Sequence, residues 1–342
     1  MHMILVSSGC YNKISNDDNV KIIEALKSSP DGVEVCLFKK EELLDYIPRG
    51  ELIGALSSRY NTLHAPIIDS NRDNIIYDNE PECIERIKSV YKIFRCNNIV
   101  FHLNNIIDNK MVKKELEGLN VSIENPDKRS AAPDYFSRIK EFTNAGYGLT
   151  IDVTHAAENN DLEELINEFR NDIVEIHWSR VCNNERHCSP FLGLKDNNEI
   201  EVIRNYELVR SLGKPIIIEL NHTNNIIDTI RDDVKLLRSF NTVFGNLNIE
   251  YYNKWIEKIC NNYDSERMNK HLIKHLGEER SSEWFASTEN LLEMAYKVKG
   301  ANTELVKKYE SILEGHDNIS IKDKIVRLLV HYIKYSEATS FP

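Results

Sequence analysis

The sequence predicts an α/β protein built on a (β/α)8 TIM barrel, followed by an all-helical C-terminal extension. Short runs rich in Ile, Val, Leu and Phe alternate eight times with longer segments of helical periodicity. Strands this apolar are typical of a parallel sheet whose outer face is covered by helices. Eight repeats of strand and helix favour a closed barrel over an open doubly wound sheet. The first strand is also not followed by GxGxxG, which argues against a dinucleotide-binding fold.

The repeats place each element in order along the chain. The expected strands occupy residues 3–8, 33–38, 60–65, 98–103, 120–124, 148–153, 173–178 and 215–220. The expected helices occupy residues 18–28, 40–57, 80–95, 109–118, 133–144, 159–170, 199–211 and 224–239. Two helix ends carry stop signals, since Gly146 follows the fifth helix and Gly213 precedes Lys214-Pro215 after the seventh.

The pattern changes near residue 246, which sets the expected domain boundary. Residues 1–245 are predicted to form the barrel, and residues 246–342 a helical C-terminal module without strands. His271 and His275 lie one helical turn apart in this module. Because the segment lacks the Glu of HExxH, we interpret them as a surface or packed pair rather than a metal site.

Composition narrows the class of protein. The chain has 342 residues, is 41% hydrophobic and carries a formal net charge of −11, which argues against a broadly basic nucleic-acid surface. No run approaches the roughly 18 apolar residues of a membrane span, and the N-terminus lacks the features of a signal peptide. The seven cysteines have no CxxC spacing and are expected to be reduced. We therefore expect a cytoplasmic protein that does not bind membranes, of undetermined oligomeric state.

Nine potential metal ligands stand at or just beyond the ends of the predicted strands. They are His64, His102, Glu124, Asp152, His155, His177, Glu185, His187 and Glu219. The carboxyl ends of barrel strands converge on one face, so residues distant in sequence meet in one pocket. So many imidazoles and carboxylates beside apolar residues would be costly to bury together without a cation. The pattern predicts a metalloenzyme site.

The segments HAP, FH, IEN, DxxH, IHW, ERH and IEL together resemble the endonuclease IV family of apurinic/apyrimidinic (AP) endonucleases, within the xylose-isomerase-like barrel superfamily. The resemblance covers about residues 1–245. It implies up to three divalent ions, usually zinc, and hydrolysis of a DNA phosphodiester 5′ to an abasic site, a DNA-repair activity. It gives the first ion His64, His102 and Glu124, the second ion Glu124, Asp152, His177 and Glu219, and the third ion His155, Glu185 and His187.

The resemblance also suggests catalytic roles. Glu124 is the expected bridging carboxylate, and Glu219 is expected to bind an ion and orient the attacking water. Arg186 is a candidate contact for a phosphate oxygen, with a surface ion pair as the alternative. The sequence departs from the family in two respects. Several spacings are shorter than in the family, and Glu185 stands where the family has Asp.

Two other functions stay open at this stage. A sugar or sugar-phosphate isomerase or epimerase of the same superfamily would hold one Mn²⁺ or Mg²⁺ with Glu124, Asp152, His177 and Glu219. Its two glutamates would then move a proton, and His155 and Arg186 would bind substrate hydroxyls. A non-catalytic binding protein that works through its helical module is the third alternative, and the retention of every ligand-type residue argues against it.

Overall fold

The computed structural model describes residues 3–28, 31–182, 185–190, 205–206, 208–221 and 226–244. Eight parallel strands close into a barrel in the order β1-β10-β7-β6-β5-β4-β3-β2. These strands are β1 (Ile4–Ser7), β2 (Gly32–Cys36), β3 (Tyr60–His64), β4 (Asn98–His102), β5 (Val121–Glu124), β6 (Gly148–Asp152), β7 (Ile173–Trp178) and β10 (Ile216–Ile218). The expected (β/α)8 barrel and all eight of its strands are confirmed.

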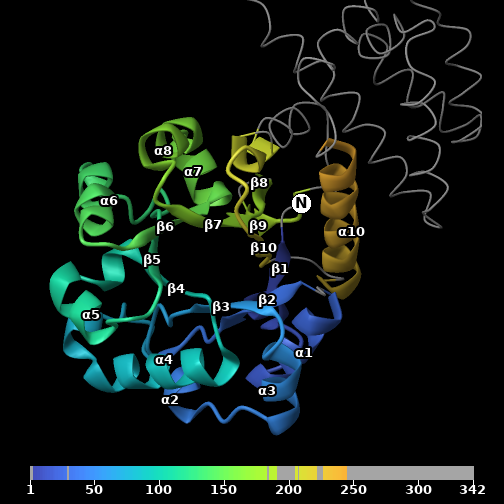
Figure 1. The fold of residues 1–342 in the computed structure, drawn as a ribbon, viewed down its shortest axis with the longest axis horizontal. Coiled ribbons are helices and arrows are strands. Elements are labelled where there is room, and N and C mark those ends of the chain that lie inside the picture. Colours follow the sequence, from blue (N-terminus) through green and yellow to red (C-terminus); the bar gives the residue numbers. More distant parts are fainter. Residues whose placement is uncertain are drawn as a thin grey trace, which may run out of the picture. The chain divides into compact units, whose positions relative to one another are not determined.

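Helices surround the ring of strands (Figure 1). They are α1 (Asp18–Ser28), α2 (Lys40–Asp45), α3 (Gly50–Leu56), α4 (Pro81–Phe94), α5 (Asn109–Glu115), α6 (Tyr135–Asn144), α7 (Val153–Asn159), α8 (Leu162–Phe169) and α10 (Ile226–Phe244). Gly146 and Gly213 have φ of 88° and 67°, the left-handed conformation expected after a helix end. Of the expected helix 199–211, residues 205–206 and 208–211 are described; residues 205–206 and 208–210 are helical and residue 211 is in a turn.

Two helical predictions differ from the structure in an informative way. The segment 40–57 contains two helices rather than one, because Pro48 keeps the residue before it out of the helical region. Tyr46, at the end of α2, already has an extended ψ of 123°. The prediction of one helix over 159–170 also missed α7, which starts directly at the end of β6. The Asp152 side chain caps α7 by accepting a hydrogen bond from the backbone N–H of His155.

Strands β2 to β7 alternate between apolar side chains and mostly polar ones. Buried apolar side chains such as Leu63, Phe101 and Ile151 occupy one set of alternating positions. The other set carries an unusually polar layer inside the barrel, formed by Glu34, Thr62, Asn98, Ser122, Thr150 and Glu175, each at most 4% exposed. Because side chains two residues apart share a face, this layer lies below the strand ends, two residues before Cys36, His64, Glu124, Asp152 and His177 and four residues before His102.

Several members of this interior layer are joined by hydrogen bonds. Asn98 Nδ2 donates to Ser122 Oγ over 2.7 Å and to Glu175 Oε1 over 3.0 Å. The hydroxyls of Ser122 and Thr150 lie 2.7 Å apart. A network of this kind fixes the relative positions of the strands β4 to β7, whose carboxyl ends carry much of the predicted site.

Residues 2–192 and 208–234 form one compact unit, which contains the barrel. The second unit includes residues 235–342, and of these only 235–244, in α10, are described. The predicted helical module 246–342, with His271 and His275, lies outside the described residues. None of the described helices is long and apolar enough to cross a membrane.

Candidate metal centre

The predicted ligands gather at the carboxyl ends of the barrel strands. Six of them end a strand or lie within one residue of its end: His64, His102, Glu124, Asp152, His177 and Glu219. Neighbouring strands are in register here, so that His102 is paired with Glu124 and Asp152 with His177. His155 lies in the first turn of α7. Glu185 and His187 lie in β9 (Glu185–Cys188), which pairs with β8 (Arg180–Cys182) in a hairpin after β7.

Glu124 is the centre of the first cluster. Its Oε2 lies 2.9 Å from His102 Nε2 and 3.7 Å from His64 Nε2. Its Oε1 lies 2.8 Å from His177 Nδ1. The Glu124 side chain is only 2% exposed, so three imidazoles surround a carboxylate that water barely reaches.

Asp152 connects this cluster to a second one. Its Oδ2 lies 3.7 Å from His187 Nδ1, and the possible ligand atoms of Asp152, His155 and His187 all lie within 4.8 Å of one another. The ligand atoms of Glu124, Asp152, His177 and Glu219 form another group within the same limit. Glu124 and Asp152 are therefore each shared by two groups, and the predicted ligands form a continuous row.

Backbone carbonyls set the orientation of two of the imidazoles. His64 Nδ1 lies 3.0 Å from the carbonyl oxygen of Ala65, and His155 Nδ1 lies 3.0 Å from that of Asn125. A carbonyl oxygen can only accept, so in each neutral ring Nδ1 carries the proton and Nε2 keeps its lone pair for a ligand. Asn125 also braces Asp152, because its side-chain amide bonds to both the backbone N–H and the carbonyl of Asp152. These contacts are of the kind that orient metal ligands.

The pKa shifts show strong coupling between these groups in the metal-free protein. Burial alone would raise the pKa of Glu124, but the imidazoles of His102 and His177 outweigh it and hold this pKa well below the usual range. Burial would likewise lower the pKa of His64, but Glu124 and Glu34 reverse the effect and raise it to about 9. Without a cation, protonated imidazoles therefore neutralise the buried carboxylates.

Carboxylate oxygens without hydrogen-bond donors indicate whether a metal ion fits the site. Oε2 of Glu124, Oδ2 of Asp152 and Oε2 of Glu219 are buried and accept no hydrogen bond of normal geometry from the described residues. Ligands at about 2.1 Å from one ion lie about 3.0 to 3.5 Å apart, close to the spacings of His177 Nδ1 from Glu124 Oε1 (2.8 Å) and from Glu219 Oε2 (3.0 Å). Imidazole and carboxylate donors in this arrangement suit Zn²⁺ or Mn²⁺.

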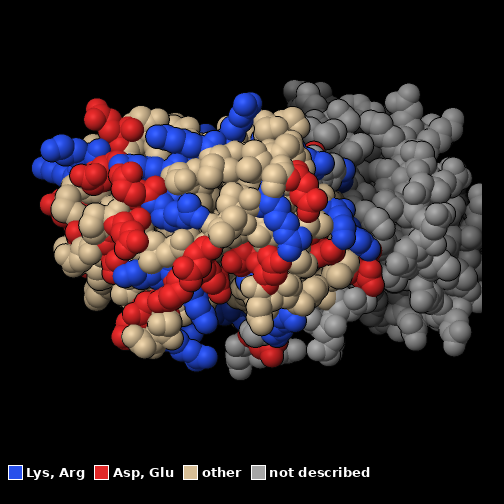
Figure 2. Space-filling model, turned by 90° about the horizontal axis from the view of Figure 1, so that it is seen from below, with Lys and Arg blue, Asp and Glu red and all other residues tan. Residues whose placement is uncertain are grey.

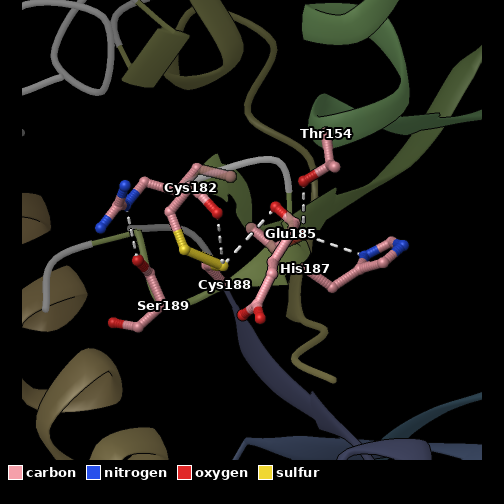
Figure 3. The surroundings of a disulfide bond; sticks show 8 residues. Thr154, Cys182, Glu185, His187, Cys188 and Ser189 are labelled. Carbon is pink, nitrogen blue, oxygen red and sulfur yellow. Dashed lines mark hydrogen bonds between the residues drawn. A yellow bond between two sulfur atoms is a disulfide. The ribbon is translucent and has the colours of Figure 1, made fainter. Parts of the chain in front are cut away.

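Glu185 does not join the group that contains its neighbour His187. Glu185 is exposed, and its carboxylate instead lies within 4.8 Å of the sulfur atoms of Cys182 and Cys188. In Figure 3, the side chains of Glu185 and His187 point in different directions. His187 has a left-handed φ of 53°, and its Nδ1 lies 3.1 Å from the Ser179 hydroxyl. The structure places Asp152 with His155 and His187, where the resemblance implied Glu185.

Cys182 and Cys188 form a disulfide across the β8–β9 hairpin (Figure 3). The expectation that all cysteines are reduced is therefore wrong for this pair. The antiparallel pairing of β8 with β9 brings the two Cα atoms to 6.1 Å, and spacing along the sequence does not reveal this pairing. The free cysteines of the described chain are Cys10, Cys36, Cys83 and Cys96, and Cys260 lies outside it.

Arg186 is held by two carboxylates. Its guanidinium pairs with Glu158 of α7 at 2.5 Å and with Asp127 in the loop after β5. Burial alone would raise the pKa of Asp127, but Arg129 and Arg186 hold it well below its usual range. These contacts tie the β9 strand, and with it His187, to two neighbouring βα segments of the barrel.

The sequence analysis missed two buried carboxylates below the pocket. Glu34 of β2 and Glu175 of β7 are at most 1% exposed, and their ligand atoms lie within 4.8 Å of His177 and of each other. Burial raises the pKa of Glu175 to about 7, with a further contribution from Glu34. A signal for this layer exists in the sequence, because a polar residue stands two positions before four of the ligands, in Thr62-x-His64, Ser122-x-Glu124, Thr150-x-Asp152 and Glu175-x-His177.

No protein family model matches the chain, and no curated protein matches it. Among solved structures, it resembles a 3-keto-D-glucoside 4-epimerase from E. coli with a TM-score of 0.48 and 17% identity, covering 70% of this chain and 100% of that one. An AP endonuclease, family 2, from Brucella melitensis gives 0.46 and 12%, covering 67% and 97%. A sugar phosphate isomerase/epimerase from Parabacteroides distasonis gives 0.44 and 11%, covering 69% and 93%. At these identities the likeness concerns the fold, which the closed ring of eight strands establishes independently.

Proposed function

We propose that the chain is a metal-dependent hydrolase of phosphate esters with a multinuclear centre. The observation that carries the proposal is the sharing of Glu124 and Asp152 between adjacent groups of ligands. One ion cannot use a row of ligands that runs from His64 and His102 to His155 and His187. Two or three ions bridged by these carboxylates would use every member of the row.

The residues divide the work of holding such ions. His64, His102 and Glu124 would hold the first, Glu124, Asp152, His177 and Glu219 the second, and Asp152, His155 and His187 the third. When bound, divalent ions polarise a phosphate and neutralise charge on the attacking and leaving oxygens. Glu219 has the more accessible side chain, 22% exposed against 2% for Glu124. It is therefore the carboxylate that a water can reach, and its other oxygen, rather than the buried Oε2, would take the proton of the attacking water.

Arg186 has a structural role in this proposal. Asp127 and Glu158 occupy its guanidinium, so we assign it to holding the hairpin that carries His187 rather than to binding phosphate. Lys and Arg side chains also alternate with Asp and Glu over the described part of the face in Figure 2. This pattern does not favour an extended DNA track on that face, so cleavage at an abasic site is tested as one substrate among several.

A single-metal sugar isomerase or epimerase is the second candidate. The four-residue group of Glu124, Asp152, His177 and Glu219 is complete by itself, and Glu185 lies outside the cluster expected for a third ion. In that case the glutamates Glu124 and Glu219 would face the substrate on either side of one ion. Hydrolysis of phosphate esters would then be absent at any metal loading.

The test of the proposal is phosphodiesterase activity of the zinc- and manganese-loaded chain on bis(p-nitrophenyl) phosphate and on an abasic duplex. Glu124→Gln keeps the side-chain shape but removes the shared charge, and we expect a loss of about a hundredfold or more in activity, together with loss of bound metal. Glu175→Gln, equally buried but below the pocket, is the matched control. Equal activity of wild type and Glu124→Gln would contradict the assignment of the centre. Cleavage of the simple diester without cleavage of the abasic duplex would leave the hydrolase standing and remove DNA as substrate.

A further inference from the structure

We propose that Glu34 is a positioning residue for His177, which it holds in the orientation that presents Nδ1 to the metal centre. This inference rests on the proposed metal centre and adds a residue from β2, a strand that supplies no predicted ligand. Glu34 Oε2 lies 3.0 Å from His177 Nε2 inside the barrel. Both side chains are at most 1% exposed, so this contact is made away from solvent.

The two ring nitrogens of His177 face different surroundings, the pocket on one side and the polar interior layer on the other. Nδ1 faces the pocket, 2.8 Å from Glu124 Oε1 and 3.0 Å from Glu219 Oε2. Nε2 faces the interior layer, where Glu34 is its partner. An imidazole that binds an ion through one nitrogen carries its proton on the other, and a carboxylate at that second nitrogen fixes both the tautomer and the ring orientation.

No other residue that the structure describes donates a hydrogen bond to the Glu34 carboxylate. Oε1 and Oε2 of Glu34 and Nε2 of His177 have no partner of normal hydrogen-bond geometry among the described residues, so the 3.0 Å contact between Glu34 and His177 is the close approach of an ion pair. Glu34 is in register with Thr62 on the neighbouring strand, and the Thr62 hydroxyl also lacks a partner there. A buried carboxylate without donors is costly, so the His177 imidazole, whose Nε2 lies 3.0 Å away, is the group placed to compensate Glu34.

Glu175 offers a matched comparison within the same layer. It is as buried as Glu34, and its possible ligand atom also lies within 4.8 Å of His177. Its Oε1, however, accepts hydrogen bonds from Asn98 at 3.0 Å and from Thr150 at 3.4 Å. Oε1 of Glu175 is therefore held by its own neighbours, although Oε2 has no hydrogen-bonding partner among the described residues. Replacement of Glu175 by Gln removes a buried carboxylate without removing the contact between Glu34 and His177 Nε2.

The experiment compares zinc binding by wild type, Glu34→Ala, Glu34→Gln and Glu175→Gln, using competition with a chelator and elemental analysis. We expect zinc affinity at the site that uses His177 to fall about tenfold to a hundredfold in Glu34→Ala. Glu34→Gln keeps an acceptor oxygen and is expected to restore part of this loss, whereas Glu175→Gln is expected to change affinity less than threefold. Long-range ¹H–¹⁵N spectra of the zinc-loaded wild type should show the His177 proton on Nε2.

The outcomes separate this inference from the proposed function. If the wild type binds no metal, the proposed function fails. If the wild type binds zinc and Glu34→Ala binds it equally well, or if the His177 proton is found on Nδ1, the role of Glu34 is wrong while the centre stands. Loss of one whole metal equivalent in Glu34→Ala, with the affinity of the others unchanged, would make Glu34 a ligand itself and would also overturn the positioning role.

Discussion

Asp161 is a buried carboxylate that the structure leaves poorly compensated. It stands at the start of α8 but makes no capping hydrogen bond through its side chain, and its Oδ1 has no partner among the described residues. Burial, together with the nearby charge of Glu164, raises the pKa of Asp161 from 3.8 to about 7. When folding raises the pKa of an acid, its ionised form destabilises the folded protein. This destabilisation is absent below the pKa of the unfolded state and increases as pH rises towards the pKa of the folded state.

Replacement of Asp161 by Asn should therefore stabilise the protein at neutral and alkaline pH. We expect a gain of about 1 to 2 kcal/mol in the free energy of unfolding at pH 8 and a much smaller gain at pH 4. Urea denaturation of the two proteins at these pH values measures the difference. An equal effect at both pH values would show that the gain does not come from removing the charge.

At this scale the sequence predicted which side chains gather at the strand ends better than it predicted what surrounds them. His64, Glu124 and Asp152 were recognisable because each ends an apolar strand, where barrel chemistry concentrates. Glu34 and Glu175 stand inside strands, and such a position is ordinarily apolar. Their placement below the pocket depends on which face of each strand points inward. The register between strands decides which face that is, and the register is set by the closed barrel rather than by any single strand.

At the level of elements, the β8–β9 hairpin is the part of the candidate site that could not be predicted from the sequence. It carries His187 into the Asp152 group and is held there by Arg186 and by the Cys182–Cys188 disulfide. The ERH segment suggested ligands but did not reveal a hairpin. His187 has a left-handed backbone conformation, and its side chain points in a different direction from that of Glu185 (Figure 3).

The disulfide of the hairpin leads to a prediction about stability and metal binding. The double variant Cys182→Ser/Cys188→Ser should lose up to about 2 kcal/mol of stability, because a short loop is no longer cross-linked in the unfolded chain. It should also bind the ion at Asp152, His155 and His187 more weakly than the ions at Glu124. Elemental analysis after dialysis against a chelator measures the metal lost. Cys83→Ser, which alters a free buried cysteine in α4, is the control. Unchanged retention of every ion in the double variant would contradict a role for the disulfide in the site.

For the whole molecule, eight strand–helix repeats were enough to predict closure into a barrel, because few other folds use so many consecutive units. The interior was less predictable. A polar middle layer replaces the usual apolar filling, and it arises from the combined register of strands β2 to β7. The helical module over residues 246–342 stays a prediction.

The coupling of imidazoles and carboxylates predicts how pH affects the metal-free protein. The pKa of His64 is raised from 6.5 to about 9, and that of His177 is also raised, so their contribution to stability is full below pH 6.5. The contribution of His64 is lost as pH rises through about 9, its folded pKa. We therefore expect the melting temperature of the metal-free protein to fall between pH 6.5 and 9. Zinc bound at the proposed centre would replace these protons, so the zinc-loaded protein should melt at a nearly constant temperature over that range. Parallel falls in both forms would contradict the proposed metal ligands.

The central claim is that one chain holds several ions in a row of shared ligands, and metal stoichiometry tests it most directly. The measurement is elemental analysis of the purified chain after loading with zinc and removal of free metal by gel filtration. Binding of two or three equivalents, reduced by Glu124→Gln, is the predicted result. One equivalent would support the single-metal alternative, and no bound metal would contradict the metal centre itself.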